Sequence, residues 1–303
     1  MAEQPLDLSA TISEQPLELE SSPSASPPGE EETEGEESLG KLVADSSFER
    51  GRHVMFLQMM YQMLPHHYQS QEINRLTLAY FAISGLDIVG SLDTVDRDEV
   101  ASWVLSFRTH PEDIAEINCA AICFMLDDWS GMDRDKATEY ILKCKAYDGG
   151  FGMTPGAESH GGGTYCAVAS LQLMGSIGVD LFSSSASSSI LDIPLLLEWC
   201  LQRQASDGGF QGRSNKPSDT CYAFWIGAVL KILGAGKLID EKALRGFLLT
   251  CQSEYGGFSK FPDELPDLYH SYYGFIAFSL LEEPGLNSIC VELGITDAAA
   301  LSK

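Results

Sequence analysis

Apolar residues recur at spacings of three and four along the chain from Phe48 onward, which is the pattern of amphipathic helices. No stretch shows the alternation that is typical of a strand, and Asp, Ser, Thr or Pro often stands where a helix would begin. The pattern therefore predicts an all-α fold. The predicted helices span 53–64, 74–86, 98–107, 118–126, 135–145, 163–175, 194–204, 221–234, 241–252 and 270–281.

The predicted helices alternate in character around a recurring Gly-Gly-Phe sequence at 149–151, 208–210 and 256–258. Helices before this sequence carry charges on one face, whereas those after it are apolar on all sides. A helix that is apolar all round is buried all round, and repeats of about 50 residues indicate an array of similar units. We therefore predict an α-α barrel of repeated helix pairs, with buried helices forming the inner ring.

Polar residues that can bind a metal recur at the entrance to the second helix of each unit. Aligning the units by their helix ends places His160 at the position of Asp219, and Cys221 at the position of His270. Aligning them by the Gly-Gly turns shifts the second match by one residue. If the units stack side by side, these residues would lie together at one end of the inner helices. The helix ends used for the alignment are Gly175, Gly234 and Glu283.

Asp219, Cys221 and His270 form the donor set of a catalytic zinc, which takes three protein ligands and keeps a fourth position open. Asp219 and Cys221 are two residues apart and would point to different sides of a regular helix. They can share a metal only if Asp219 lies in the loop or at the N-cap. The alternative is structural: Asp219 caps the helix, Cys221 is a core thiol and His270 is a satisfied core histidine.

Composition separates an acidic tail from the folded part. Residues 1–46 hold 12 acidic residues against Lys41 and no aromatic residue, which predicts disorder. Residues 47–303 form the predicted domain. The tail carries -11 of the formal net charge of -25, and the remaining -14 of the folded part argues against nucleic acid as a partner. The first ten residues lack the basic and apolar regions of a signal peptide, and no run reaches 18 apolar residues, so neither a signal peptide nor a membrane span is expected. The eight cysteines contain no CxxC pair, which indicates reduced thiols and a cytoplasmic protein.

Three strings of the sequence resemble the β subunits of protein prenyltransferases, over roughly residues 47–295. They are ESHGG at 158–162, GRSNKPSDTCYAFW at 212–225 and PDLYHSYYG at 266–274. The similarity is greatest to the plant-like type I geranylgeranyltransferase members. The resemblance implies a zinc enzyme whose β subunit pairs with a helical α subunit. It transfers a C20 isoprenoid from geranylgeranyl diphosphate to the cysteine of a C-terminal CaaX sequence ending in Leu, as in Rho-type small GTPases.

The resemblance also implies roles for further residues. Lys260 stands where farnesyl enzymes have a magnesium-binding aspartate, so magnesium is not expected to be required. Thr77 stands where they have a bulky tryptophan, which implies room for C20. The diphosphate is assigned to His160, Arg213, Lys216 and Tyr222. Aromatic side chains of the inner helices are predicted to wall the isoprenoid funnel, with core packing as the alternative for some of them: Tyr165, Phe224, Trp225, Tyr272, Tyr273 and Phe275.

One departure from the family predicts an incomplete ring. The family has at least one further helix pair and a Gly-rich loop where this chain runs directly from Pro111 to Glu112, and the run 115–118 lacks an arginine that relatives have. The competing hypothesis is therefore a catalytically silent form that binds the α subunit or zinc without turnover. A terpene cyclase is a third hypothesis, which the absence of a DxDD motif disfavours.

Overall fold

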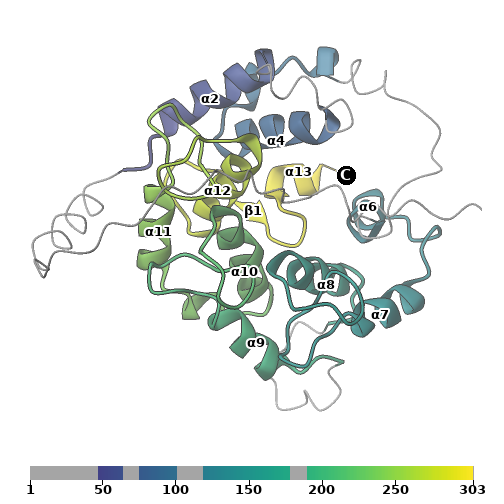
Figure 1. Cartoon of the computed structure of the whole chain (residues 1–303). Coiled ribbons are helices and arrows are strands. Elements are labelled where there is room, and N and C mark those ends of the chain that lie inside the picture. Colours follow the sequence, from purple (N-terminus) through teal and green to yellow (C-terminus); the bar gives the residue numbers. More distant parts are fainter. Residues whose placement is uncertain (1–46, 64–74, 101–118, 178–189, 303) are drawn as a thin grey trace, which may run out of the picture.

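The computed structural model describes residues 47–63, 75–100, 119–177 and 190–302, and their arrangement is helical (Figure 1). The all-α prediction is confirmed, and most predicted helices begin and end within a few residues of their expected bounds. The helices are α2 (Arg50–Gln62), α4 (Arg75–Ile88), α6 (Cys119–Leu126), α7 (Arg134–Lys143), α8 (Gly161–Leu173), α9 (Ile193–Leu201), α10 (Thr220–Ile232), α11 (Glu241–Thr250), α12 (Leu268–Leu280) and α13 (Asp297–Leu301).

Several predictions fall partly or wholly outside the described residues. The predicted helix 98–107 is described only up to residue 100, where 97–100 is helical and Asp96 accepts hydrogen bonds at its start. The acidic tail 1–46 and the junction at 111–112 lie outside. The pattern did not predict the short antiparallel strands β1 (Ile289–Cys290) and β2 (Ile295–Thr296), nor the 3-10 turns η3 (Leu92–Thr94) and η6 (Gly236–Leu238).

Helices α8, α10 and α12 lie side by side as the inner wall, and α4 continues it beyond α12. The outer helices α9 and α11 cover them. An aspartate N-cap starts each outer helix, with Asp192 accepting from the amide of Leu195 and Asp240 from that of Ala243. Each outer helix packs against the Gly-Gly turn of the unit before it. A Cβ at Gly208 would lie 2.3 Å from the carbonyl oxygen of Ala243, so only glycine fits there.

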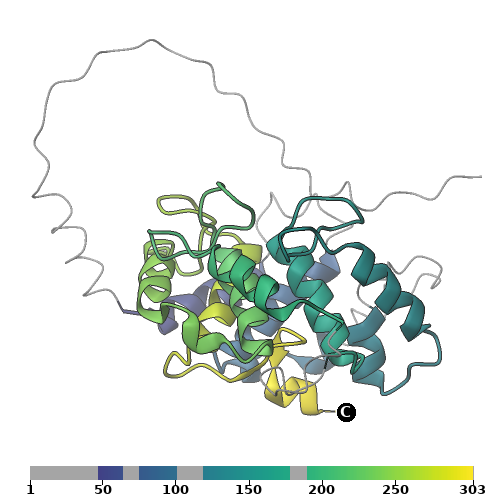
Figure 2. The ribbon, with the colours of Figure 1, turned by 90° about the horizontal axis from the view of Figure 1, so that it is seen from below.

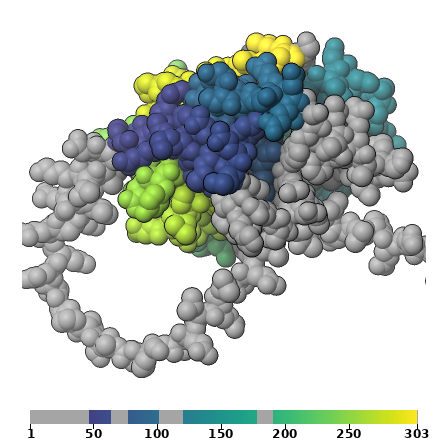
Figure 3. Space-filling view, turned by 90° about the horizontal axis from the view of Figure 1, so that it is seen from above, coloured from purple at the N-terminus to yellow at the C-terminus, as the bar shows by residue number. Residues whose placement is uncertain are grey.

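Helix α2 takes the place of an outer helix over the third Gly-Gly turn, although it is about 200 residues away in sequence. A Cβ at Gly256 would lie 2.2 Å from the carbonyl oxygen of Arg52, as at Gly208. His53 accepts a hydrogen bond from the amide of Gly257 at 2.9 Å. Figure 3 shows the purple surface of α2 against the yellow-green surface of this part of the chain. The start of the domain thereby continues the ring after its last unit.

The described part of the ring does not close between α6 and α4. Helix α6 packs against α8, but within the described residues it makes no extensive contact with α4. Three apolar side chains of α6 are exposed: Ile122 by 42%, Met125 by 43% and Leu126 by 71%. Side chains of this kind are buried on α10 and α12. The exposure therefore marks a place where a neighbouring helix would complete the barrel.

The two ends of the inner helices differ. The loops that lead into α8, α10 and α12 gather at one end, and the C-terminal segment lies at the other end (Figure 2). Strands β1 and β2 pair with Ile289 opposite Thr296 and Cys290 opposite Ile295. Among the described helices, none is long and apolar enough to cross a membrane.

Candidate metal centre and apolar cavity

The N-caps of the inner helices fix how the three units correspond. His160, Asp219 and Asp267 cap α8, α10 and α12, and each lies 11 residues after its first glycine. Alignment by the Gly-Gly turns is therefore correct. The match of Cys221 with His270 is wrong, because Cys221 corresponds to Tyr269. The third unit differs at its other end, where Glu282 at φ 60 takes the left-handed conformation of Gly175 and Gly234.

The structure brings Asp219, Cys221 and His270 together. One donor atom from each lies within 4.8 Å of the others, so these three side chains could hold a metal ion and form a candidate metal-binding cluster. Asp219 is the N-cap of α10, which is the position that its spacing to Cys221 requires. Its Oδ1 accepts from the amide of Cys221 at 2.9 Å. Capping and metal binding therefore do not exclude each other at this residue.

Asp267 is a functional candidate that the sequence analysis missed. Its Oδ1 accepts from the amide of His270 at 2.8 Å, and its Oδ2 lies 2.6 Å from the Nδ1 of the same residue. The Nε2 of His270 faces Asp219 Oδ1 at 3.4 Å. A carboxylate on one ring nitrogen fixes the tautomer and orientation that a metal-binding histidine needs. The signal was the Asp-x-x-His spacing at the N-cap, which the helix-end alignment concealed.

The electrostatics of the cluster favour a bound cation. Burial lowers the pKa of His270, but hydrogen bonds to Asp219 and Asp267 outweigh it and raise the pKa to about 9. Burial raises the pKa of Asp219, yet its bonds to His270 and Cys221 bring it below the ordinary value. Burial, and then the charge of Asp219, raise the pKa of the Cys221 thiol well above its ordinary value. Without a metal ion, Cys221 and His270 therefore keep protons on the atoms that would bind the metal. A metal ion has to displace these protons.

The predicted cationic residues Lys260, Arg213 and Lys216 differ in their contacts near the N-terminus of α10. Lys260 Nζ lies 4.0 Å from Asp219 Oδ2 and 5.0 Å from the ring centre of Phe261. Arg213 Nη1 lies 3.7 Å from Glu158 Oε2, in a partly exposed pair. Lys216 is exposed in the same loop as Arg213.

His160 and Tyr222 meet between two units. The Nε2 of His160 lies 3.1 Å from the hydroxyl of Tyr222, and its Nδ1 accepts from the amide of Gly162. Gly212 rests on the Tyr222 ring so closely that a Cβ there would overlap ring atoms. Its carbonyl accepts from the amide of Gly161 at 2.9 Å. The loop that carries Arg213 is thereby held over the start of α8 and α10.

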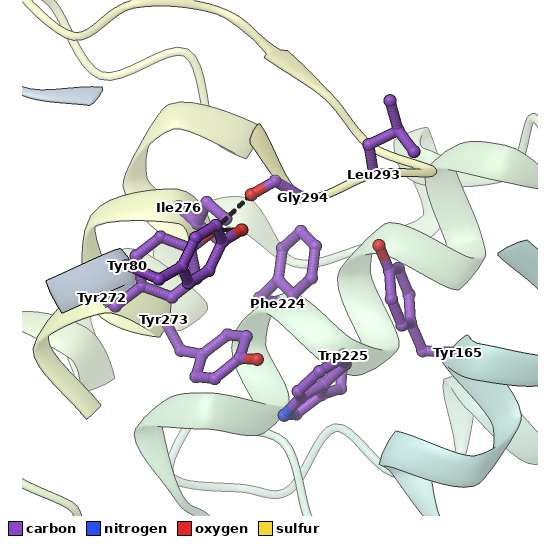
Figure 4. A pocket seen from close by; sticks show the side chains of 9 residues that line it. All are labelled: Tyr80, Tyr165, Phe224, Trp225, Tyr272, Tyr273, Ile276, Leu293 and Gly294. Carbon is purple, nitrogen blue, oxygen red and sulfur yellow. Dashed lines mark hydrogen bonds between the residues drawn. The ribbon is translucent and has the colours of Figure 1, made fainter. Parts of the chain in front are cut away.

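An apolar cavity of about 60 Å³ lies deeper among the inner helices (Figure 4). Its wall includes most of the predicted aromatic residues. Phe275 is the exception, because it is fully buried in the core between His53 and Phe258. Thr77 is exposed on α4, one turn before the lining residue Tyr80. The cavity is lined by Tyr80, Tyr165, Phe224, Trp225, Tyr272, Tyr273, Ile276, Leu293 and Gly294.

Tyr269 connects the cavity to the metal-binding cluster. Its hydroxyl interacts with the Cys221 thiol and with Trp225, and its ring packs edge-on to His270 with the centres 4.9 Å apart. It also contacts the ring of Tyr273, which lines the cavity. The candidate metal-binding residues and the cavity wall therefore lie side by side in one continuous site.

Comparisons with known proteins agree with this architecture. The Prenyltransferase alpha-alpha toroid domain family matches residues 48–116 and 109–295. The chain is 51% identical to the geranylgeranyl transferase type-1 subunit beta of Arabidopsis thaliana, over 84% of this chain and 91% of that protein. It is 40% identical to the protein of that name from Dictyostelium discoideum, over 60% of this chain and 49% of that protein.

A solved structure shares the fold. It is the Candida albicans protein geranylgeranyltransferase-I complexed with GGPP, with a TM-score of 0.73 and 21% identity over 84% of this chain and 97% of that one. The Arabidopsis alignment runs over 340 positions, more than the 303 residues of this chain. Since 84% of 303 is about 255, about 85 of those positions lie opposite gaps in this chain. The chain is thus internally shorter than this relative.

Proposed function

Because this chain belongs to the prenyltransferase alpha-alpha toroid family, we propose that it is the β subunit of a zinc-dependent protein geranylgeranyltransferase. It transfers a C20 isoprenoid from geranylgeranyl diphosphate to the cysteine of a C-terminal CaaX sequence that ends in Leu. Its partners are an α subunit and CaaX proteins such as Rho-type small GTPases, in the cytoplasm. The names of the relatives support the reaction, and the meeting of Asp219, Cys221 and His270 carries the proposal.

The donor set suits zinc. A carboxylate, a thiolate and an imidazole are its ordinary ligands, and three protein ligands are typical of catalytic sites. Zinc held there would supply a Lewis acid that lowers the pKa of a substrate thiol, about 8.5 in a free cysteine, toward neutral pH. Asp267 keeps the imidazole of His270 oriented toward the other two ligands. Asp219 combines the capping of α10 with metal binding, which holds the ligand rigidly.

The chain's cations bind the diphosphate. Transfer forms a bond between the substrate sulfur and C1 of the isoprenoid while the C1–O bond breaks, and the diphosphate leaves with the electron pair. Negative charge therefore grows on the leaving group, where cations and hydrogen-bond donors stabilise it. Arg213 and Lys216 supply charge from the loop, and His160 and Tyr222 supply donors. The N-terminus of α10 adds its helix dipole.

Lys260 replaces a divalent cation in this arrangement. Its ammonium lies 4.0 Å from Asp219 Oδ2, at the border between the metal-binding cluster and the diphosphate loop. A fixed positive charge there can meet the diphosphate directly, so turnover does not require magnesium. Transfer that stops when magnesium is chelated, while zinc stays bound, would contradict this.

A second candidate function follows from the shortened chain. About 85 positions of the Arabidopsis alignment lack a counterpart in this chain, and α6 has no extensive contact with α4 within the described residues. A chain of this kind can keep the metal-binding cluster, which lies on the opposite arc, and still fail to bind the substrates productively. It would then be a silent partner of the α subunit.

Zinc analysis of the purified heterodimer, followed by labelled geranylgeranyl transfer to a CaaX peptide ending in Leu, separates the two. One zinc per heterodimer with transfer supports the enzyme. Zinc without transfer selects the silent partner. A heterodimer with neither zinc nor transfer contradicts the enzyme and leaves only a partner that binds the α subunit.

A further inference from the structure

The C-terminal segment closes the end of the apolar cavity that is remote from the metal-binding cluster. Along α10, Phe224 lies one turn deeper than Cys221, about 4.5 Å, and along α12, Ile276 lies nearly two turns deeper than His270, about 9 Å. Gly294 sits against these two deeper side chains. In Figure 4, Leu293 and Gly294 lie on the opposite side of the cavity from Trp225 and Tyr273.

Hydrogen bonds hold this segment in the wall. The hydroxyl of Tyr272 donates to the carbonyl of Gly294, and that of Tyr165 donates to the carbonyl of Val291 at 2.9 Å. The amide of Asn287 donates to the carbonyl of Ile88 on α4 at 2.8 Å. The segment is thus tied to α4, α8 and α12, and it forms a fixed floor for the cavity.

Gly294 is the point of this floor where a side chain is missing. Its φ of +67° is a conformation that other residues rarely adopt. A Cβ there would point at the Cζ atom of Phe224, at 3.4 Å, and at the Cδ1 atom of Ile276, at 3.7 Å. Added atoms would therefore occupy the bottom of the cavity.

We propose that Gly294 determines the length of isoprenoid that the site accepts, with the cavity of about 60 Å³ receiving only the distal end of the chain. The distal isoprene unit of a C20 chain needs the space that the absent side chain leaves, whereas a C15 chain ends before the floor. This inference rests on the proposed function. It locates the length limit on the C-terminal segment, on a different element from the exposed Thr77 of α4.

The test compares Gly294→Ala with Gly285→Ala in the complete heterodimer. Gly285 has φ +86° in the same C-terminal region, and a Cβ there would meet only the Arg50 side chain, at 3.7 Å. Gly285→Ala therefore reproduces the backbone strain without adding atoms to the cavity. Equilibrium binding of geranylgeranyl and farnesyl diphosphate is measured for both variants and the parent. We expect Gly294→Ala to lower the ratio of C20 to C15 affinity by about tenfold or more, and Gly285→Ala to leave it unchanged.

Ile276→Val provides an independent test that spares the strained glycine. It removes the Cδ1 atom that faces Gly294, so it should widen the floor and raise the C20 to C15 ratio severalfold. An unchanged ratio in both Gly294→Ala and Ile276→Val overturns the inference alone, provided that the parent binds geranylgeranyl diphosphate. If Gly294→Ala and Gly285→Ala lower the C20 to C15 affinity ratio equally, the effect comes from backbone strain, and the inference is overturned as well. A parent that binds neither diphosphate overturns the proposed function together with this inference.

Discussion

At the residue scale, Asp267 uses its two carboxylate oxygens for two tasks. One oxygen caps α12 and the other binds the imidazole of His270. Substitution by asparagine keeps an acceptor for the cap but removes the charge that orients the ring. We expect Asp267→Asn to lower the zinc affinity of the heterodimer by about 10- to 100-fold, measured by competition with a chromophoric chelator.

The matched control for this prediction is Asp240→Asn. Asp240 caps α11 through the amide of Ala243 at 2.9 Å, and Figure 1 shows α11 among the outer helices. The control should leave zinc affinity unchanged. Equal losses in both variants would mean that capping, and not the contact with His270, explains the effect.

Arg213 and Glu158 should affect diphosphate binding in opposite directions. Their side chains lie 3.7 Å apart, so Glu158 competes with a diphosphate for the same guanidinium. Arg213→Gln should weaken binding of geranylgeranyl diphosphate by about tenfold or more. Glu158→Gln should strengthen it by up to about fivefold, because partly exposed pairs contribute little.

Glu139→Gln controls for the change in net charge. Glu139 pairs with Lys143 on α7, at 2.8 Å. Glu139→Gln should leave the affinity for geranylgeranyl diphosphate unchanged. If Glu158→Gln weakens binding, then Glu158 supports the loop and does not compete for Arg213.

At the scale of elements, the packing of α2 over the third Gly-Gly turn depends on a neutral histidine. His53 accepts from the amide of Gly257 through Nδ1, and its Nε2 lies 3.0 Å from Gln252 Oε1, to which it donates. Burial lowers the pKa of His53 to about 4, from 6.5. The unfolded chain therefore binds a proton between these values and the folded chain does not. Stability contributed by this residue is complete above pH 6.5 and is lost as the pH falls toward 4.

We expect the free energy of unfolding to fall by up to about 3 kcal/mol more between pH 7 and 4 than in a His53→Gln variant. Glutamine keeps one donor and one acceptor but does not titrate. The measurement is urea unfolding at a series of pH values, with the difference between the two proteins as the readout. If the free energy of unfolding depends on pH in the same way in both proteins, the packing of α2 does not depend on the neutral ring of His53.

The elements differ in how far the sequence predicts them. The inner helices α10 and α12 are predictable because an apolar residue at nearly every position leaves only burial on all sides. The position of α2 is not, since its partners Gln252 and Gly257 are about 200 residues away. The register of the third unit was obscured because Glu282, and not a glycine, adopts the left-handed conformation at its end. For the same reason, the sequence predicts that Asp219, Cys221 and His270 lie together but does not indicate Asp267 beside them.

At the scale of the whole molecule, the candidate metal-binding cluster and the predicted gap lie on different arcs of the ring. Helices α10 and α12 are enclosed by neighbours on both sides, and the N-caps that build the cluster belong to this arc. Helix α6 has α8 on one side and exposes Leu126 by 71%. Local stability follows the number of buried apolar contacts. The gap should therefore weaken α6 much more than the metal-binding cluster.

Hydrogen exchange can test this division. We expect the amides of α6 to exchange at least about tenfold faster than those of α10. Insertion of the corresponding Arabidopsis segment at the predicted deletion point, between Pro111 and Glu112, should slow exchange in α6, because it would supply apolar surface to cover Ile122 and Leu126. A Gly-Ser linker of equal length is the control and should leave α6 unprotected, since it offers chain without apolar side chains. If the amides of α6 already exchange as slowly as those of α10 in the present chain, other residues close the ring. The prediction of an incomplete barrel is then wrong. In that case a failure of geranylgeranyl transfer would have to originate at the substrate-binding residues themselves.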